Sequence, residues 1–353
     1  MADLNAIIDA APDNQLIQNT LMKMHLKLNS FSRPVCSVSG GSDSDIMLDI
    51  CERVRCDRTV RYVFFDTGIE YEATKRHLDE LEQKYGIKIA RRNAVVPVPL
   101  GCKQYGQPFM SKEVSQRIKE LQAHGFAFED KPLENLLKEY PAAKAGVGWW
   151  CNAKKYGISA YQYLKEYMIE NPPSFAISDK CCNGAKKRPS KMIEKNCDLK
   201  ILGLRQTEGG VRATSYTSCF SVDSHGLAQY RPLWFWSDAD KTEYKQHYGV
   251  TYSDCYEVWG FKRTGCAGCP FNSWFEDGLA KMERYEPKMA QAAKNIFGDA
   301  YAYTRAYREY RDRRKELART ELDGQARMED YITPHIAGGK EQEYESSNPV
   351  PWL

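Results

Sequence analysis

The sequence lacks any run of about 20 consecutive apolar residues, the length that a membrane-spanning helix requires. Its first residues carry acids and no apolar core, so we expect no signal peptide. The sequence also lacks a strong excess of charge, because it has 50 basic and 47 acidic residues and a formal net charge of +3. These absences predict a cytoplasmic protein with no membrane partner, in which any binding of nucleic acid would have to come from a local patch of charge.

Repeats, low-complexity segments and the GxxxxGK[ST] phosphate-binding motif are absent too, which excludes repeat architectures and the common P-loop. With 42% apolar and 27% charged residues, the composition is that of an ordinary globular protein. A chain of 353 residues can bury one large core or two modest ones.

Strands and helices alternate along the chain. Apolar and β-branched segments predict strands at residues 33–41, 58–68, 87–94, 174–182 and 197–210. Helical spacing of apolar residues predicts helices over 14–30, from about 43, and over 70–86. We expect Gly86 to stop the last of these, and Ser237 with Asp240 to form a capping box for a later helix. This alternation predicts an α/β fold with a doubly wound parallel sheet.

The chain divides into three predicted parts. Residues 1–32 hold an N-terminal helix, residues 33–271 the α/β domain, and residues 272–353 a helical C-terminal region with a loose tail. Residues 101–150 break the strand–helix rhythm with Gly and Pro, and we expect them to be an insertion over the ligand-binding edge of the sheet.

A glycine-rich stretch, SGGSDS, lies between the first predicted strand and a helix. Free backbone amides and the positive end of the helix dipole bind phosphate at such a junction. Gly40 and Gly41 would let the backbone approach a ligand closely. Three serines add hydroxyl groups: Ser39, Ser42 and Ser44. Taken alone, the stretch is compatible with an ordinary tight turn or with a phosphate cradle.

Four motifs in order resemble the phosphoadenosine-phosphosulfate (PAPS) reductase family, within the adenine-nucleotide α-hydrolase (PP-loop) superfamily. SGGSDS resembles the pyrophosphate-binding loop, and FFDTGIEYEAT resembles the motif of the second strand. ILGLRQTEGGVR resembles the Gly-x-Arg…Glu…Arg motif, and the segment from PLWFWSDADK to CAGCP is similar to the closing motif. The resemblance covers about residues 33–271 and implies a Rossmann-like fold that binds an adenine nucleotide.

The same resemblance implies a set of site residues. The loop would hold the nucleotide phosphates through Ser39, Gly40, Gly41, Ser42, Asp43 and Ser44. Asp66, Thr67 and Gly68 would lie beside the nucleotide, at the end of the second strand. Arg205 and Arg212 would reach its anionic groups and, with Asp43, act in catalysis. A helix terminus offers only about half a positive charge, so these arginines, with Mg²⁺ as a further candidate, would supply the remainder.

Four of the twelve cysteines come in pairs, Cys181–Cys182 and Cys266–Cys269, and the other eight are scattered. In a reducing compartment we expect the scattered ones to be buried apolar residues, and CxxC to be a hook for zinc or iron–sulfur. The arrangement CC…CxxC resembles the iron–sulfur subgroup of the family, which implies a [4Fe–4S] cluster on all four thiolates. Zinc and no metal remain alternatives. Lys186 and Lys187 follow the first pair, either as anion ligands or as a solvated basic loop.

Reductases of this family attack the sulfonate sulfur with a further cysteine near the C-terminus, whereas no cysteine follows Cys269 here. This favours an ATP-dependent sulfurtransferase that adenylates a nucleic acid or metabolite and draws on a sulfur donor protein. One alternative is an adenylyl-sulfate or PAPS reductase that uses another thiol, such as Cys151 or Cys219. A further alternative is a non-catalytic nucleotide-binding or nucleic-acid-binding protein.

The predicted helix at 299–322 combines many basic residues with tyrosines. Such a combination can bind nucleic acid, because basic residues contact phosphates and aromatic rings stack on bases. However, Tyr303, Tyr307 and Tyr310 have the spacing of a stripe that packs on a core. Both interpretations remain open from the sequence.

Overall fold

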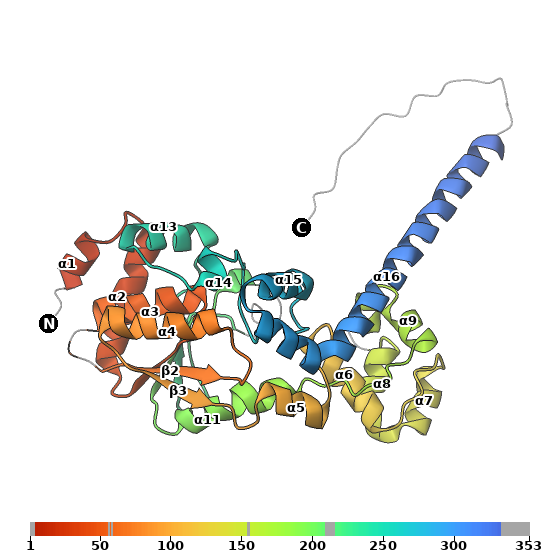
Figure 1. Cartoon of the computed structure of the whole chain (residues 1–353), viewed down its shortest axis with the longest axis horizontal. Coiled ribbons are helices and arrows are strands. Elements are labelled where there is room, and N and C mark those ends of the chain that lie inside the picture. Colours follow the sequence, from red (N-terminus) through yellow and green to blue (C-terminus); the bar gives the residue numbers. More distant parts are fainter. Residues whose placement is uncertain (1–3, 56, 58, 154–155, 209–215, 333–353) are drawn as a thin grey trace, which may run out of the picture.

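The computed structural model describes residues 4–55, 57, 59–153, 156–208 and 216–332, with the backbone alone described over 321–332. A six-stranded sheet forms its centre, in the order β3-β2-β1-β4-β6-β5 (Figure 1). The strands are β1 (Pro34–Ser37), β2 (Arg61–Asp66), β3 (Ile89–Asn93), β4 (Leu199–Leu202), β5 (Phe220–Val222) and β6 (Ala228–Tyr230). Neighbouring strands run parallel except β5, which pairs antiparallel with β6. The predicted parallel α/β sheet is confirmed, with an antiparallel edge strand in addition.

The two faces of the sheet are covered by different helices, because alternate residues of a strand point to opposite sides. Tyr62 and Phe64 of β2 belong to the main core with helices α2 (Gln15–Ser30), α3 (Ser42–Val54), α4 (Glu72–Tyr85) and α13 (Asp238–Tyr248). Val63 lies in a smaller cluster with Ile193 of α11 (Arg188–Glu194), on the other face. Helices on both faces make the sheet doubly wound, as predicted.

Local signals place several helix ends where the sequence predicts them. Gly86 ends α4 with a φ of 61°, and Ser237 with Asp240 forms the capping box of α13. Asn14 caps α2 by accepting from the amides of the next turn. These ends agree with the sequence because capping depends on neighbouring residues alone. The remaining short elements are α1 (Leu4–Asp9), α14 (Asp254–Glu257) and the single turns Pro141–Ala143, Ile158–Ala160 and Gln206–Glu208.

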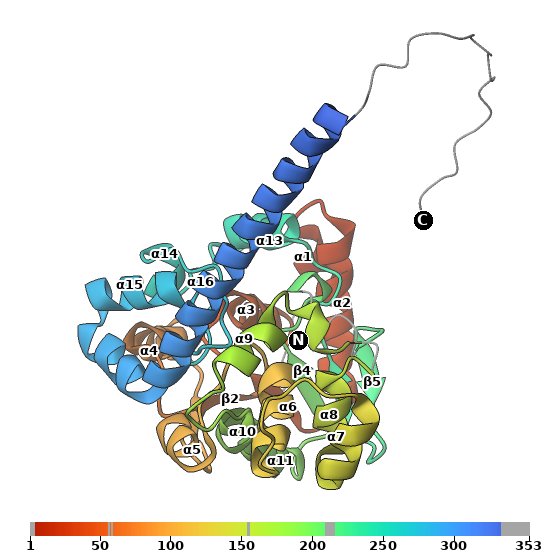
Figure 2. The ribbon, with the colours of Figure 1, turned by 90° about the vertical axis from the view of Figure 1, so that its right-hand side faces the viewer.

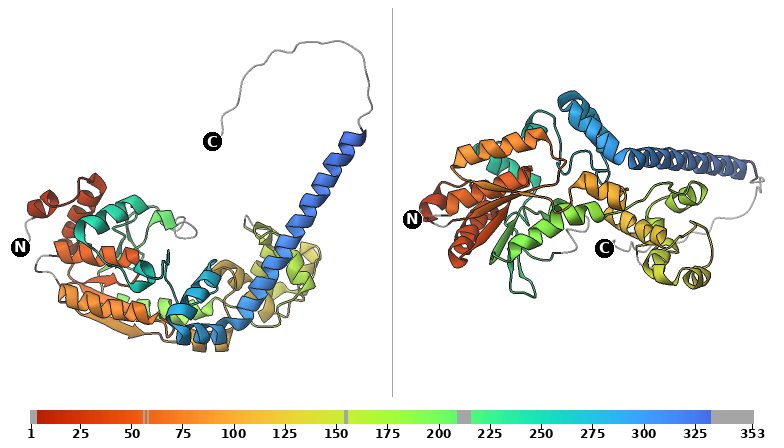
Figure 3. Two further views of the ribbon diagram at one scale, coloured as in Figure 1. Left: turned by 45° about the horizontal axis from the view of Figure 1, so that its top comes forward. Right: turned by 60° about the horizontal axis from the view of Figure 1, so that its bottom comes forward.

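The segment after β3 forms a helical cluster of its own. It begins with α5 (Val98–Tyr105) and continues through α6 (Lys112–Ala123), α7 (Leu133–Glu139), α8 (Lys144–Trp150) and α9 (Leu164–Glu170). Its core holds Trp149 and Trp150, extends from Phe109 to Ile177, and also includes Tyr307 of the C-terminal helix, but it includes no residue of the sheet. Figure 3 shows this cluster beside the long C-terminal helix and to one side of the sheet, and in Figure 2, where the right-hand side of Figure 1 faces the viewer, the cluster lies in front of the sheet. The domain limits proposed at 33–271 stay a prediction.

One predicted strand is wrong. Residues 174–182 form only an isolated bridge between Gln107 and Ile177. The chain then enters α10 (Lys180–Cys182), whose first amide donates to Ser178 Oγ, and continues through a π-helical turn (Asn183–Lys187). The apolar run finds no neighbouring strand of the sheet to pair with, so the first cysteine pair lies on a helix.

The predicted helical C-terminal region contains two helices, α15 (Phe275–Tyr285) and α16 (Pro287–Ile332), and the helix predicted at 299–322 lies within α16. Tyr303, Tyr307 and Tyr310 surround Tyr167 of the helical cluster, with ring centroids 5.1, 5.6 and 5.4 Å from it. These tyrosines therefore pack on the cluster, while the distal part of α16 projects away from the sheet (Figure 1). The predicted loose tail, from 333 onward, lies outside the described residues. No described helix is long and apolar enough to cross a bilayer.

Candidate functional site

The glycine loop connects β1 to α3, and the hydroxyl of Ser44 determines its shape. Ser44 Oγ accepts from the amides of Ser39 at 3.2 Å and Gly41 at 3.1 Å, and donates to the Gly41 carbonyl at 2.8 Å. The side chain is 4% exposed. Ser44 therefore holds the loop in place through contacts within the loop itself.

Neighbouring side chains leave little room for a Cβ atom at either glycine of the loop. Gly40 has a φ of 64°, and a Cβ atom there would lie 2.6 Å from Thr74 Cγ2. A Cβ atom on Gly41 would lie 3.2 Å from Tyr256 Oη, which hydrogen-bonds to Thr264 Oγ1 at 2.8 Å. Tyr256 belongs to α14, so the segment that leads to the CxxC pair packs directly on the loop.

A cavity of about 630 Å³ opens along this loop. Besides the loop, its walls come from the end of β4, the start of α13, the turn before α11, and residues 262–265. Acidic lining residues are Asp43, Glu70 and Asp238. Cationic lining residues are Lys186, Lys187, Lys200, Arg205, Lys241, Lys262 and Arg263. Because the cations outnumber the acids, the cavity suits a polyanion.

Asp43 and Arg205 form an ion pair at the N-terminus of α3. Arg205 Nε lies 3.1 Å from each carboxylate oxygen of Asp43, and Nη2 lies 2.9 Å from Asp238. Lys241 also pairs with Asp43 and donates to Ser42 Oγ at 2.8 Å. Burial alone would lower the pKa of Arg205, but the two carboxylates raise it, so this guanidinium stays charged.

Sequence reasoning missed Lys241 as a site residue. The only signal was its place in the first turn of the helix that Ser237 and Asp240 cap, within the closing motif. Arg212, predicted to reach the nucleotide, lies outside the described residues.

The predicted Asp66–Thr67–Gly68 group does not line the cavity, as far as the structure describes its walls. Asp66 Oδ1 accepts from the Gly68 amide at 2.8 Å, and Thr67 is fully buried. Thr67 Oγ1 donates at 2.5 Å to Glu70, which does line the cavity and which sequence reasoning missed. Burial raises the pKa of Glu70, and the Lys186 ammonium opposes that rise.

The two cysteine pairs meet beside residues 67–69. Cys181, Cys182 and Cys266 belong to one packed cluster with Cys102 of α5 and Ile69, and the Ala267 amide donates to the Ile69 carbonyl at 3.0 Å. Burial and neighbouring sulfur atoms raise the pKa of each of the four thiols, although Lys186 opposes the rise for Cys266. No group of three or more potential ligands in the described part of the chain is arranged around a single metal ion.

A buried ion pair lies directly beneath the loop. His77 Nε2 of α4 is 2.9 Å from Asp45 Oδ2 of α3, and the two side chains are 2% and 0% exposed. Burial alone would lower the pKa of His77, but the carboxylate of Asp45, with a contribution from Glu80, raises it above its ordinary value of 6.5. The pair ties α4 to the first turn of α3, which carries the loop.

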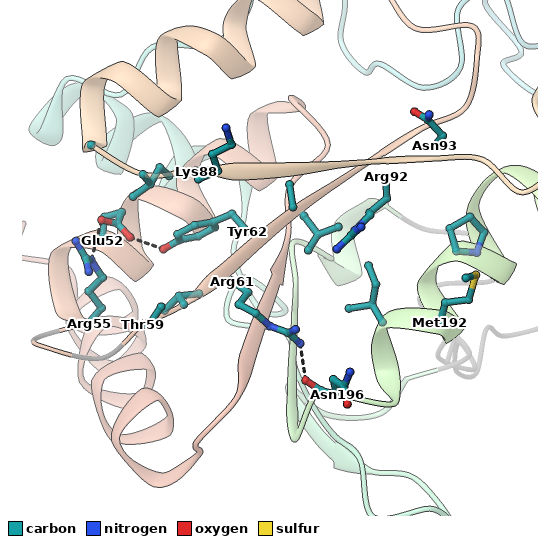
Figure 4. A pocket seen from close by; sticks show the side chains of 17 residues that line it. Glu52, Arg55, Thr59, Arg61, Tyr62, Lys88, Arg92, Asn93, Met192 and Asn196 are labelled. Carbon is teal, nitrogen blue, oxygen red and sulfur yellow. Dashed lines mark hydrogen bonds and ion pairs between the residues drawn. The ribbon is translucent and has the colours of Figure 1, made fainter.

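A second cavity, of about 600 Å³, lies between β2, β3 and α11 (Figure 4). It shares no lining residue with the cavity along the glycine loop. It is therefore a separate feature of the fold.

Comparisons with known proteins identify relatives of the chain. The sequence profile of the phosphoadenosine phosphosulfate reductase domain matches residues 33–147 and 145–272. An uncharacterised protein of Methanocaldococcus jannaschii is 24% identical over 285 residues, which cover 79% of this chain and 43% of that protein. The chain thus spans less than half the length of this relative.

Three solved structures are similar at low scores. A PAPS reductase from Candida auris, in a phosphate complex, has 14% identity and a TM-score of 0.40 over 74% of this chain and 93% of that chain. The U34-tRNA thiolase NcsA from Methanococcus maripaludis, with its [4Fe-4S] cluster, has 14% identity and a TM-score of 0.34 over 84% and 79%. An NH₃-dependent NAD synthetase from Campylobacter jejuni has 11% identity and a TM-score of 0.35 over 86% and 96%. At these scores the likenesses carry no conclusion about chemistry.

Proposed function

Because this chain belongs to the phosphoadenosine phosphosulfate reductase domain family, we propose that it is an ATP-dependent sulfurtransferase. An oxygen of the acceptor attacks the α-phosphate of ATP, the bond between the α-phosphate and the bridging oxygen breaks, and pyrophosphate leaves. A sulfide equivalent then attacks the activated atom of the acceptor, and AMP leaves with the acceptor oxygen. The acceptor is a nucleic acid or a metabolite.

The observation that supports ATP is the cationic cavity along the glycine loop. Its loop supplies the N-terminus of α3, and its walls supply seven cationic side chains. A helix terminus alone offers about half a charge, which a triphosphate exceeds several-fold. Arg205 and Lys241 lie at the N-terminus of α3, but both form ion pairs with Asp43. A Mg²⁺ ion that binds with the nucleotide would take Asp43 as an oxygen ligand and release both cations to the phosphates.

The sulfur side of the reaction is assigned to the four paired cysteines. Gly265 and Lys186 line the cavity, Cys266 directly follows Gly265, and Cys266 interacts electrostatically with Lys186. Four thiols suit zinc or iron–sulfur, but a single tetrahedral ion needs sulfur atoms that converge to about 2.3 Å from it. The described thiols are not grouped that closely. Two adjacent cysteines are awkward as joint ligands of one tetrahedral ion, so we assign a [4Fe–4S] cluster to Cys181, Cys182, Cys266 and Cys269. When bound, it would supply iron that holds a transferable sulfur atom.

Sulfonucleotide reduction is the second candidate, and the cavity argues against it. Reduction needs a thiolate that reaches the sulfur of the bound nucleotide. No cysteine belongs to the described lining of the cavity. Cys151 packs in the helical cluster, and Cys219 packs against the main core beside β5. Neither thiol is placed to attack a nucleotide there.

The test is a product assay on anaerobically purified protein. We expect ATP, with tRNA, DNA or metabolite fractions as acceptors, to yield AMP and pyrophosphate. Replacement of Lys241 by Met should slow this reaction by about tenfold or more, because one charge-assisted contact is lost. Thioredoxin-dependent release of sulfite from adenylyl sulfate or PAPS would overturn the proposal in favour of a reductase. Nucleotide binding without turnover of either kind would favour a non-catalytic protein.

A further inference from the structure

The charged side chains that line the cavity between β2, β3 and α11 are mainly positive. The cavity is lined by Arg55, Arg61, Lys88 and Arg92, against a single carboxylate, that of Glu52. That carboxylate is already engaged, since Glu52 lies 2.8 Å from Arg55 Nε and accepts from Tyr62 Oη at 2.5 Å. No other carboxylate belongs to the described lining of the cavity, so cations outnumber acids there.

Two guanidinium groups project into this space (Figure 4). Arg61 of β2 donates to the carbonyl of Asn196, which lies two residues beyond the end of α11. The backbone of Arg92 pairs with β2, but its guanidinium forms no hydrogen bond or ion pair with any side chain that the structure describes. A guanidinium presents its donors in a fork that matches a carboxylate, phosphate or sulfonate.

The rest of the wall is apolar. Val63 and Ala90 of the sheet and Ile193 and Met192 of α11 contribute apolar side chains to it, with Ile193 packed in the same small cluster as Val63. Met192 is 65% exposed, although a methionine usually lies in a core or at a binding surface. The volume of about 600 Å³ lies within the range of pockets that hold small organic molecules and is close to that of the cavity along the glycine loop.

We propose that this cavity binds a small amphipathic anion, with its acidic head on Arg61 and Arg92 and its apolar body between the sheet and Met192. The site is distinct from the glycine loop and does not depend on the proposed sulfur chemistry. β3 is an edge strand, and cations on such an edge also discourage pairing between chains. That role requires no ligand, so a binding measurement separates the two explanations.

The probe is the fluorescent anion 8-anilinonaphthalene-1-sulfonate, titrated into the folded full chain. We expect one saturable site per chain. Octanoate should displace the dye, and octanol at the same concentration should not, because it lacks the charge. Replacement of Arg92 by Glu should weaken binding by about tenfold or more, since an attractive charge becomes a repulsive one.

Three further variants locate the dye. Met192→Glu places a carboxylate at the apolar wall and should also abolish binding, whereas Met192→Leu should preserve it. Lys262→Glu changes a cation of the other cavity and should leave the affinity unchanged. Circular dichroism should show that all variants are folded. The proposal is overturned if the dye does not bind, if Arg92→Glu binds it as well as the wild type, or if Lys262→Glu loses it equally.

Discussion

Arg205 Nε lies equidistant, at 3.1 Å, from the two carboxylate oxygens of Asp43, and this contact joins the end of β4 to the first turn of α3. Both residues are proposed phosphate ligands, yet in this structure they neutralise each other. Asp43 also pairs with Lys241, so one carboxylate restrains two cations at the place where a phosphate would bind. Nucleotide binding must therefore compete with this carboxylate or neutralise it.

Asp43→Asn should separate binding from turnover. The amide keeps the shape of the side chain and removes the charge that holds Arg205 and Lys241. Calorimetry without Mg²⁺ should show tighter binding of ATP than in the wild type. Release of AMP should fall, because a neutral amide binds Mg²⁺ more weakly than a carboxylate. Weaker binding of ATP without Mg²⁺ would show that Asp43 does not oppose the phosphates.

Gly41→Ala should impair nucleotide binding through Tyr256, because the new Cβ atom would lie 3.2 Å from the phenol oxygen. Either the tyrosine or the loop must then shift by a few tenths of an ångström. In a Tyr256→Phe background that oxygen is gone, and we expect Gly41→Ala to cost much less affinity there. Gly41→Val, with a larger side chain, should abolish binding of ATP in both backgrounds while circular dichroism shows a folded chain. Full affinity in Gly41→Val would rule out the loop as the phosphate site.

Gly40 and Gly86 offer a matched pair for stability. Both have left-handed φ values, 64° and 61°, but a Cβ atom would lie 2.6 Å from Thr74 Cγ2 at Gly40 and meets nothing within 4 Å at Gly86. Gly86→Ala should cost about 1 kcal/mol in the free energy of unfolding, from the backbone alone. Gly40→Ala should cost about 1–3 kcal/mol more, from the added clash. Urea denaturation measures both, and equal losses would mean that Thr74 moves aside freely.

The His77–Asp45 pair predicts a pH dependence of stability. The pKa of His77 is raised in the folded state, so between pH 6.5 and that raised value the folded chain holds more protons than the unfolded one. Stability from this pair is complete below pH 6.5 and is lost as the pH rises through the folded pKa, by up to about 1.4 kcal/mol per pH unit. His77→Gln should flatten this part of the profile, whereas His124→Gln, at an exposed position, should not. An unchanged slope in His77→Gln would assign the dependence to other groups.

The cysteine pairs predict the colour of the protein. Prepared without oxygen, it should be brown and contain about four irons per chain, as a [4Fe–4S] centre would give. Cys182→Ser or Cys266→Ser should lose iron and colour, while Cys151→Ser, in the helical cluster, should keep both. A colourless preparation with one zinc per chain would contradict the cluster.

The elements that the sequence predicted well are those determined by near neighbours. The glycine loop lies between a strand and a helix because an apolar strand ends there and capping residues follow. Gly86 and the Ser237 box mark helix ends for the same reason. The strand expected at 174–182 was wrong, because a strand exists only where a partner strand offers its backbone groups. The antiparallel pairing of β5 with β6 could likewise not be predicted from the local sequence pattern.

The sequence by itself determined the family, the loop and which cysteines come in pairs. Only the tertiary structure decided which side chains meet. Lys241 reaches Ser42 from 199 positions away, and Arg205 reaches Asp43 from 162 positions away. These contacts exist because β1 lies between β2 and β4 in the sheet, so parallel strands bring their carboxyl ends to one edge. No local periodicity encodes that order. The order of the strands follows from how the whole chain buries its apolar faces. That order in turn determines which charged side chains meet at the site.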